Sequence, residues 1–155
     1  TRRYAYSFGG SRAVDSTPLS KPKNATILSS IQLNGTLHYT TFSGGTTVER
    51  FKRYLETDLL PHLNGNSVLV MDNMKSHHAK AVKDLLDSSG VRYIYLPPYS
   101  PDLNLIEKLR SKVKALLRKF KARTPDALPN AIQNAFHAVT VSDCSGWFRF
   151  CGYAL

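Results

Sequence analysis

The sequence contains few cysteines and no long apolar run. A membrane-spanning helix needs about 20 consecutive apolar residues, and no apolar run among these 155 residues comes close to that length. The first residues also lack the basic segment and apolar core of a signal peptide. The two cysteines, Cys144 and Cys151, do not form the repeated pairs of a disulfide framework or a zinc site, so we expect reduced, partly buried thiols. These absences predict a cytoplasmic protein without a membrane-spanning segment.

Acidic residues are scarce as well. The chain has 11 Asp and Glu against 21 Lys and Arg, which gives a formal net charge of +10 and a pI near 9.8. This balance predicts a polyanionic partner, and DNA, RNA and anionic lipid all fit that description. Apolar residues make up 42% of the chain, enough for one ordinary core. We therefore predict a single domain over residues 1–155.

The first half of the chain has the pattern of two strands and a helix. Residues 25–33 and 36–42 are rich in β-branched and apolar types, and the Asn-Gly pair between them is typical of a hairpin turn. The preceding segment mixes Gly, Ser, Pro and charge without a period, as an exposed loop does. After the hairpin, apolar residues at helical spacing predict a helix that is capped by Thr46 or Thr47 and ends between Pro61 and Gly65.

A βαβ unit follows. The segment SVLVMD is a short continuous apolar run, typical of a strand buried on both faces, and it ends in Asp72. A helical stripe ending near Gly90 comes next, and then VRYIYL has the pattern of a second buried strand, stopped by Pro97. Ligands of parallel sheets bind beyond the carboxyl ends of the strands. Asp72 and the loop PPYSPDLN are both predicted to lie at that edge.

A long helix is predicted from about Asn104, and its apolar residues share one face. The charged residues that share another face are Glu107, Arg110, Lys114, Arg118 and Lys121. We call the last four the basic ridge. An all-positive helix face repels itself unless an anion compensates, so we expect the ridge to contact phosphate rather than only solvent. Such contacts bind DNA with salt-dependent and largely sequence-independent affinity.

The end of the chain holds one more predicted helix. The segment Thr124-Pro125-Asp126 has the pattern of a helix start, and apolar residues continue at helical spacing to about Val139. The chain then closes with the aromatic segment WFRFCGYAL.

Asp72 and Glu107 are the candidate functional carboxylates. An Asp at the end of a buried strand is costly unless it is hydrogen-bonded, paired or bound to a metal. On its own, Asp72 also fits a loop cap that accepts backbone N–H groups. Glu107 on its own fits the favourable position of an acid in the first turn of a helix. The pair is more informative than either residue, and thirty-four residues separate the two.

Two long segments carry a resemblance to a known family. VLVMDNMKSHHAKAV followed by YLPPYSPDLNLIEKLRSKVKALLR resembles the DDE-superfamily transposases of the mariner-related bacterial insertion-sequence branch. That family has Asp-Asn and a nearby His after one strand, then a Pro-Pro-Tyr-Ser-Pro loop that leads to Glu, with thirty-four residues between the two acids. The C-terminal segments ALPNAIQNAF and CSGWFRFCGY are also similar, so the resemblance covers about residues 27–153.

The resemblance implies an α/β, RNase H-like fold with a mixed β-sheet flanked by helices. It also implies that Asp72 and Glu107 are catalytic and that, with a third acid, they bind two divalent cations. Mg²⁺ or Mn²⁺ suits such hard carboxylate ligands. Two ions about 3.5–4 Å apart activate the attacking oxygen and stabilise the leaving one at a phosphodiester.

The implied function is that of a transposase catalytic domain, which cleaves DNA and transfers the strand without a covalent protein–DNA intermediate. The implied partners are transposon ends, target DNA and a second copy of the chain in a synaptic homodimer, in a bacterial cytoplasm.

The chain departs from the family pattern in three places. The first catalytic Asp lies on the family's first strand, which the resemblance places before Thr1. We therefore expect an N-terminally truncated core that lacks this acid, most of that strand and the helix-turn-helix domain. Asp15, in a Gly/Pro/Ser loop, is a poor substitute. Leu105 stands where the family has Pro, and Arg110 stands where an apolar or aromatic residue is common. Neither of these two changes removes a metal ligand.

Residues beside the acids each have two interpretations. Asn73 and His77 match family positions that orient the carboxylate or contact phosphate, whereas helix capping and a solvated histidine are the alternatives. His78 is expected at the surface. Asp102 lies five residues before Glu107, and we expect it to be a turn residue rather than the catalytic acid.

The chain also has aromatic residues that can stack on bases. They are Tyr95, Tyr99, Trp147 and Phe148. Ordinary packing is the favoured interpretation for all four.

Three functions fit the sequence. The leading hypothesis is a metal-dependent endonuclease and strand transferase that is competent only with the upstream segment. The alternative is a non-catalytic DNA-binding remnant of a transposase, because one acid is absent. A different RNase H-like nuclease is a third hypothesis, against which the C-terminal resemblance argues.

Overall fold

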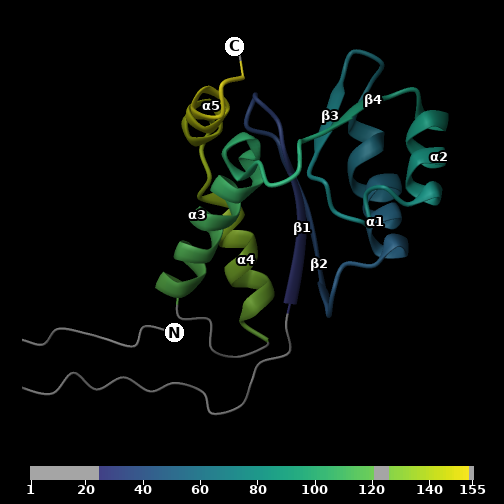
Figure 1. Ribbon diagram of the computed structural model, residues 1–155. Helices are drawn as coiled ribbons and strands as arrows, with labels where there is room; N and C mark the ends of the chain where they lie inside the picture. The colour runs from purple at the N-terminus through teal and green to yellow at the C-terminus, as the bar shows by residue number, and fades with distance from the viewer. Residues whose placement is uncertain (1–24, 121–125, 154–155) are drawn as a thin grey trace, which may run out of the picture.

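A β-hairpin in the middle of the molecule separates two groups of helices (Figure 1). The computed structural model describes residues 25–120 and 126–153. The strands are β1 (Ala25–Ile31), β2 (Leu37–Ser43), β3 (Val68–Met71) and β4 (Arg92–Tyr95). The helices are α1 (Val48–Tyr54), α2 (Lys80–Ser89), α3 (Leu105–Phe120), α4 (Leu128–His137) and α5 (Val141–Phe150). Helices α3 and α4 lie on one side of the hairpin, and α1 and α2 lie on the other.

Strands β1 and β2 form the predicted hairpin. They pair antiparallel, from Ala25 opposite Ser43 to Ile31 opposite Leu37. Gly35 has a φ of 87°, a conformation that suits glycine, and it also lets the turn approach α5. A Cβ at this position would lie 2.7 Å from Cγ2 of Val141. The Asn-Gly signal in the sequence is confirmed.

The predicted βαβ unit is confirmed as well. Strands β3 and β4 pair in parallel, from Val68 opposite Arg92 to Met71 opposite Tyr95. Helix α2 connects them and ends at Gly90, which adopts the left-handed conformation with a φ of 72°. We expected a sheet with both antiparallel and parallel strands, and the structure has one antiparallel pair and one parallel pair. Over residues 25–120 and 126–153, however, no strand pairing joins the two pairs.

The hairpin contributes to two hydrophobic cores because neighbouring residues of a strand point to opposite faces. On one face, Ile27, Ile31 and Tyr39 pack against the cluster around Leu109 of α3 and Phe136 of α4. The rings of Tyr39 and Phe136 stack with their centroids 3.9 Å apart. On the opposite face, Leu28 packs against a second cluster. The buried members of this second cluster are Phe51, Tyr54, Leu55, Leu59, Met71, Val82 and Leu86.

The helix predicted from Thr47 is present, but its second half is irregular. Thr47 caps α1 by accepting the backbone N–H of Arg50. After α1, the chain continues as a π-helical turn, Leu55–Leu59, and a 3₁₀ turn, Leu60–His62. Tyr54 is buried at the end of α1, and burial raises the pKa of its hydroxyl to about 12.

Helix α5 forms where the sequence was interpreted only as an aromatic C-terminal segment. Its start is a capping box in which Thr140 and Asp143 satisfy each other's backbone N–H groups. Lys112 of α3 also binds the Asp143 carboxylate. The Thr-x-x-Asp pattern was therefore the signal for this helix in the sequence.

The two thiols lie on and just after α5. Cys144 and Cys151 are buried and unpaired, as expected, and burial raises the pKa of both thiols. Among the described helices, none has the length and apolarity needed to cross a bilayer.

Candidate functional site

Asp72 follows directly on the last residue of β3, at the carboxyl end of the parallel pair. Its Oδ1 accepts the backbone N–H of Met74 at 3.1 Å and lies 2.8 Å from Nδ1 of His77. The hydrogen bond from Met74 is the one expected if Asp72 caps the loop that follows β3. The side chain nevertheless remains 38% exposed, so its second oxygen is not sealed in the core. Asp72 is thus a held but accessible carboxylate.

His77 is buried beside Asp72, with 8% of its surface exposed. Its ring stacks on Phe51 with centroids 4.1 Å apart, and its backbone carbonyl accepts the hydroxyl of Tyr95 at 2.9 Å. Nδ1 also lies 3.2 Å from the backbone carbonyl of Asp72. The two Asp72 atoms near Nδ1, the carboxylate Oδ1 and the backbone carbonyl oxygen, are both acceptors. Nδ1 therefore carries the proton and donates it. The alternative of a solvated histidine is wrong, because packing and hydrogen bonds enclose the ring.

Asn73 and His78 form a second contact next to the first. The Nε2 of His78 is hydrogen-bonded to the Oδ1 of Asn73, and the His78 ring stacks on Tyr95 at 4.0 Å. Asn73 is exposed, whereas His78 is half-buried rather than on the surface as expected. The turn between β3 and α2 is therefore packed against the end of β4, which limits the freedom of the Asp72 backbone.

Glu107 lies in the first turn of α3, as the sequence predicted. The helix start is supported by Asn104, whose side chain accepts the Ile106 N–H at 3.3 Å. Glu107 Oε1 lies 3.5 Å from Nη1 of Arg110 in the next turn, and the two side chains are 46% and 60% exposed. Glu107 is accessible, and a cation is its immediate neighbour.

Several neighbouring groups shift the pKa of Asp72. The hydrogen bond from His77 is the main cause that lowers the Asp72 pKa, and desolvation opposes it. The charge of His77, the Met74 N–H and, last, the positive charge of Arg110 lower this pKa further.

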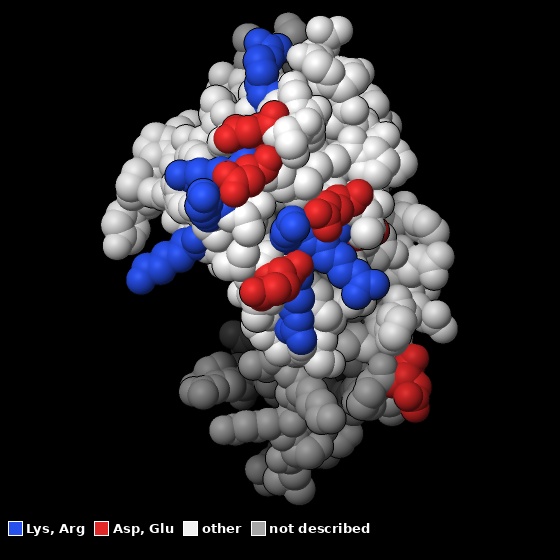
Figure 2. Space-filling model, turned by 90° about the vertical axis from the view of Figure 1, so that its right-hand side faces the viewer, with Lys and Arg blue, Asp and Glu red and all other residues white. Residues whose placement is uncertain are grey.

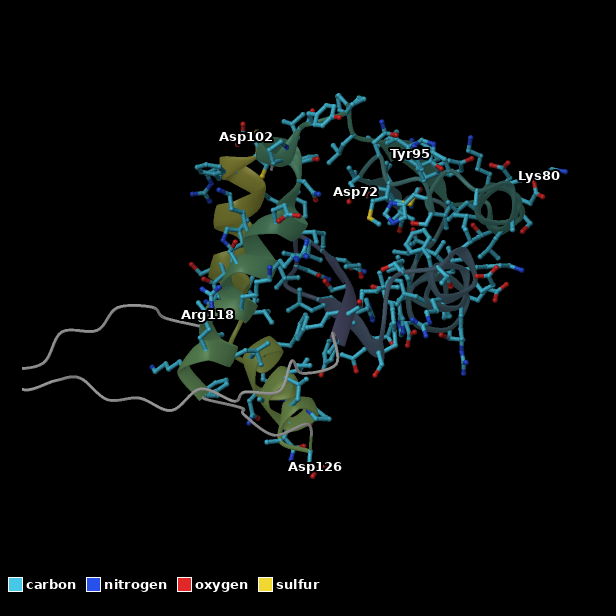
Figure 3. All side chains as sticks on the ribbon, turned by 60° about the horizontal axis from the view of Figure 1, so that its bottom comes forward. Asp72, Lys80, Tyr95, Asp102, Arg118 and Asp126 are labelled. Atoms are coloured by element: carbon cyan, nitrogen blue, oxygen red, sulfur yellow. The ribbon has the colours of Figure 1, made fainter. Side chains whose placement is uncertain are left out.

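Figure 3 shows how these elements face one another. Asp102 lies near the N-terminal end of α3 and Arg118 lies toward its other end, while Asp72 and Tyr95 lie across from this helix on the β3–β4 pair. Asp102 is exposed in a short 3₁₀ turn, Pro101–Leu103, which agrees with the turn role expected for it.

The described members of the basic ridge are exposed on α3. They are Arg110, Lys114 and Arg118. Two other lysines of this helix have partners: Lys112 binds Asp143, and Lys108 lies 3.9 Å above the ring of Phe150. Lys121 and Asp15 lie outside the described residues, as does the predicted helix start at Thr124-Pro125.

The face that carries α2 has a different charge pattern. Figure 2 shows Lys and Arg beside Asp and Glu on that face. In α2 itself, Lys80 and Lys83 are accompanied by Asp84 and Asp87. Glu107, by contrast, is the only acid of α3. Positive residues therefore outnumber negative ones on α3, whereas the two signs balance on α2.

Three of the four aromatic candidates pack against other side chains, and the fourth is exposed. Tyr95 packs on His78, and Trp147 packs against the core around Leu109. Phe148 contacts Tyr153 edge-on at 5.8 Å. Tyr99 is fully exposed, so the expectation of a packing role is wrong for this residue. Its φ of 56° is rare for a tyrosine. The loop between β4 and α3 thus presents an aromatic ring to solvent.

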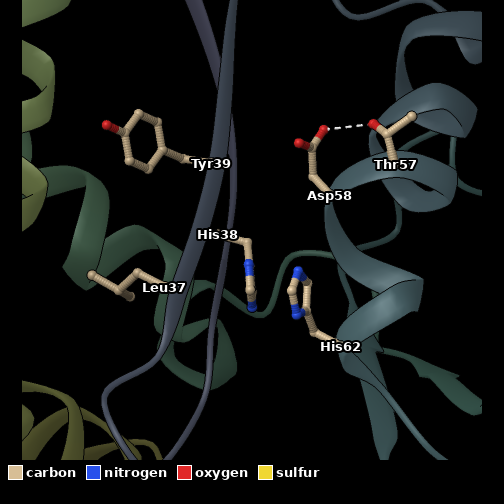
Figure 4. A pocket seen from close by; sticks show the side chains of 6 residues that line it. All are labelled: Leu37, His38, Tyr39, Thr57, Asp58 and His62. Atoms are coloured by element: carbon tan, nitrogen blue, oxygen red, sulfur yellow. Dashed lines mark hydrogen bonds between the residues drawn. The ribbon is translucent and has the colours of Figure 1, made fainter.

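A separate polar cavity of about 250 Å³ lies between β2 and the turns after α1 (Figure 4). Its lining residues are Leu37, His38, Tyr39, Thr57, Asp58 and His62. The rings of His38 and His62 stack at 4.3 Å. Desolvation and the nearby His62 lower the pKa of His38, and Asp58 opposes this change. None of the predicted site residues lines this cavity.

The residues around Asp72 fit a metal ion only in part. Carboxylate oxygens are suitable ligands for Mg²⁺ or Mn²⁺. Within residues 25–120 and 126–153, however, no group of three His, Cys, Asp or Glu side chains is arranged to hold a metal. The carboxylate oxygens are suitable ligands, but too few of them lie together. The described residues therefore supply at most part of such a metal site.

Comparisons with known proteins identify a family and a structural relative. A family model described as DDE superfamily endonuclease matches residues 1–128. Among solved structures, the chain is similar to one in the crystal structure of a pre-cleavage Mos1 transpososome, with a TM-score of 0.73 and 17% identity. The match covers 96% of this chain and 47% of that one, so the chain spans about half the length of its structural relative. No curated protein matches the sequence. The structural likeness confirms the α/β, RNase H-like fold class.

Proposed function

Because the chain belongs to the DDE superfamily of endonucleases, we propose that it is the catalytic core of a DNA transposase, with Asp72 and Glu107 as two of its catalytic, metal-binding acids. The observation that carries this proposal is the position of the two carboxylates. Asp72 follows the carboxyl end of β3, and Glu107 lies in the first turn of α3 beside Arg110. Ligands of such sheets bind at this edge. The thirty-four residues between the acids agree with the family spacing.

Enzymes of this superfamily generally use divalent metal ions. The ions supply activation of the attacking oxygen and stabilisation of the leaving oxygen of the phosphodiester. In this proposal Asp72 and Glu107 hold the ions together with a third acid from the segment before Thr1. His77 and the Met74 N–H fix the direction of the Asp72 carboxylate, which supports its role as a ligand.

The DNA partners follow from the exposed basic groups. Arg110, Lys114 and Arg118 support contact with the phosphate backbone, which carries most of the non-specific affinity for DNA. Asn73 and the ring of Tyr99 are exposed and are further candidates for contact. We extend the proposal to transposon ends and target DNA as substrates, a homodimer as the active assembly and a bacterial cytoplasm as its location.

The second candidate function is a DNA-binding remnant without catalysis. The observation that favours it is the shortage of metal ligands among the described residues. The two functions differ in one property: a remnant binds DNA and does not cut it under any metal condition.

A cleavage assay separates these candidates. The test protein is the chain together with its upstream residues, incubated with DNA that carries the ends of the element, with Mg²⁺, with Mn²⁺ and with EDTA. We expect cleavage that requires either metal. The 155-residue chain alone is expected to bind the same DNA without cutting it. Metal-independent cutting, or no cutting by the extended protein, would count against a transposase core.

The basic ridge makes a separate prediction about salt. Replacing Lys114 and Arg118 together by Gln should weaken DNA binding about tenfold at 100 mM salt, because two phosphate contacts are lost. The slope of log affinity against log salt should fall by about 2. Fluorescence anisotropy of a labelled duplex measures both quantities. The control is Arg53→Gln with Lys80→Gln, which makes the same charge change with exposed residues of α1 and α2. Equal losses in the two double variants would show that net charge alone controls binding.

A further inference from the structure

Tyr99 is the most exposed of the large apolar and aromatic side chains that the structure describes. It is fully exposed, whereas Phe150, the next in that set, is 66% exposed. The φ of Tyr99 is 56°, in the left-handed region that bulky residues rarely adopt. Glycine adopts this region freely, and asparagine tolerates it. The position therefore holds a residue type that strains the backbone and whose ring is covered by none of the side chains in residues 25–120 and 126–153.

The loop that carries this ring is held at both of its ends. The backbone N–H of Leu96 donates to the carbonyl of Met71 at 2.7 Å, which ties the start of the loop to the end of β3. The hydroxyl of Tyr153 donates to the carbonyl of Leu103 at 3.0 Å, which ties the end of the loop to the C-terminal segment. Three prolines lie between these two anchors, and each proline ring fixes its own φ. The ring is therefore presented on a restrained loop, which lowers the entropic cost of a contact with a partner.

The first of these anchors limits the distance between Tyr99 and the carboxyl edge of the β3–β4 pair. Leu96 is bonded to Met71, and Asp72 is the next residue after Met71. Tyr99 follows Leu96 by three residues, which span at most about 11 Å of extended chain. That length corresponds to about three nucleotides of a DNA strand, at about 3.4 Å each. A strand bound at this edge, where ligands of parallel sheets bind, therefore passes within reach of the ring.

An exposed aromatic ring followed by a basic helix suits a nucleobase. Proteins that bind single-stranded nucleic acid combine aromatic rings, on which bases stack, with cations that contact the backbone. Arg110, Lys114 and Arg118 are exposed on α3, the helix that follows this loop. Neighbouring bases cover both faces of a base inside a paired duplex. A tyrosine ring can therefore stack only on a base that is unpaired or terminal.

We propose that Tyr99 stacks on an unpaired nucleobase of the DNA bound at this edge of the β3–β4 pair. This inference rests on the proposed transposase function, and it names a feature of the DNA that the basic ridge cannot distinguish, because phosphate contacts carry no information about the bases. Every base has a flat face, so the ring selects unpaired structure and not a particular sequence. The strained conformation of Tyr99 agrees with this role, because such strain is concentrated at sites that contact ligands.

The test is DNA binding by the 155-residue chain in EDTA, because the proposed contact needs no metal. The probe is a fluorescent duplex with a short single-stranded overhang, and the competitor is relaxed closed-circular DNA, which has no end and no unpaired base. Tyr99→Asn removes the ring and tolerates the positive φ. We expect it to weaken binding to the overhang duplex about tenfold and to change the affinity for circular DNA less than about twofold. Tyr99→Phe keeps the ring and should bind both DNAs as the parent does.

Phe150→Asn is the matched control, because it removes another exposed ring, on α5. Its affinities for both DNAs should stay within about twofold of the parent values. The melting temperature of Tyr99→Asn should not fall below that of the parent, since the substitution removes no contact and relieves strain. Photo-cross-linking from 5-iodouracil in the overhang, mapped by mass spectrometry, should identify the peptide that contains Tyr99.

Several results would overturn the proposal. Equal losses of affinity for the two DNAs in Tyr99→Asn show that the ring has no preference for an unpaired base. Parental affinity for both DNAs shows that the ring does not contact DNA, and it leaves the proposed transposase function intact. Unchanged DNA binding with a loss of self-association, measured by sedimentation velocity, assigns the ring to a contact with a second copy of the chain. A parent chain that binds neither DNA contradicts the proposed function as well, so the two failures are distinguishable.

Discussion

Replacing Asp72 by Asn, or Glu107 by Gln, is expected to lower the rate of DNA cleavage about a thousandfold or more. Each substitution keeps the size of the side chain and removes the negative charge that binds a hard cation. Loss of a group that stabilises charge in the transition state costs about two to three orders of magnitude in rate. Loss of a metal ligand acts on both the attacking and the leaving oxygen, so the effect should lie at the upper end of that range.

The measurement is single-turnover cleavage of end DNA by the extended protein in Mg²⁺. DNA affinity in the absence of metal should not fall in either variant, because each removes a negative charge from a surface that binds phosphate. Asp102→Asn is the matched control, since it makes the same change in an exposed turn five residues before Glu107. Its cleavage rate should stay within about twofold of the parent. Parental rates in Asp72→Asn or Glu107→Gln would refute the catalytic assignment.

The second large effect is expected at His77. Replacing it by Phe should retain the stacking on Phe51 and remove the Nδ1 hydrogen bond to Asp72. Partners that orient a metal ligand typically contribute about 10- to 100-fold in activity or metal affinity. We therefore expect a loss of that size in cleavage rate for His77→Phe. His77→Asn has an N–H donor and should recover part of the loss, which a purely structural role for the ring does not predict.

His77→Phe should also change how stability depends on pH in the metal-free chain. The pKa of Asp72 is lowered in the folded state, mainly by His77. A lowered pKa stabilises the folded chain above the ordinary Asp value near 4, and this contribution disappears as pH falls through the folded value. Urea unfolding should therefore show a larger destabilisation of His77→Phe at pH 7 than at pH 3. An equal destabilisation at both pH values would mean that the hydrogen bond contributes nothing through Asp72.

Local sequence patterns predicted most of the elements that position the site. The Asn-Gly turn, the two strands around α2 and the amphipathic α3 each follow from the preferences of residues close together in the chain. The burial expected for those two strands was wrong, because Val68 of β3 and Ile94 of β4 are exposed. The same holds for the place of Asp72 at a strand end and of Glu107 in a first turn. Helix α5 was also encoded locally, in the Thr140–Asp143 capping box, but its aromatic composition obscured that pattern.

Side-chain environments could not be predicted in the same way. The burial of His77 depends on Phe51 of α1 and on Tyr95 of β4. The exposure of Tyr99 depends on a backbone conformation with positive φ, which its residue type does not indicate. Arg110 appeared in the sequence as one of several cations of the basic ridge, and the structure shows its guanidinium 3.5 Å from Glu107.

The sequence alone determined the α/β class, the two candidate acids and their spacing, and the excess of positive charge on one helix. These properties depend on residue type and short-range periodicity, which are visible without coordinates. The tertiary structure decided the surroundings of each acid: a buried histidine holds Asp72, and an exposed arginine pairs with Glu107. The burial of His77 depends on Phe51 and Tyr95, which are far from it in the chain, and only the folded arrangement brings them together.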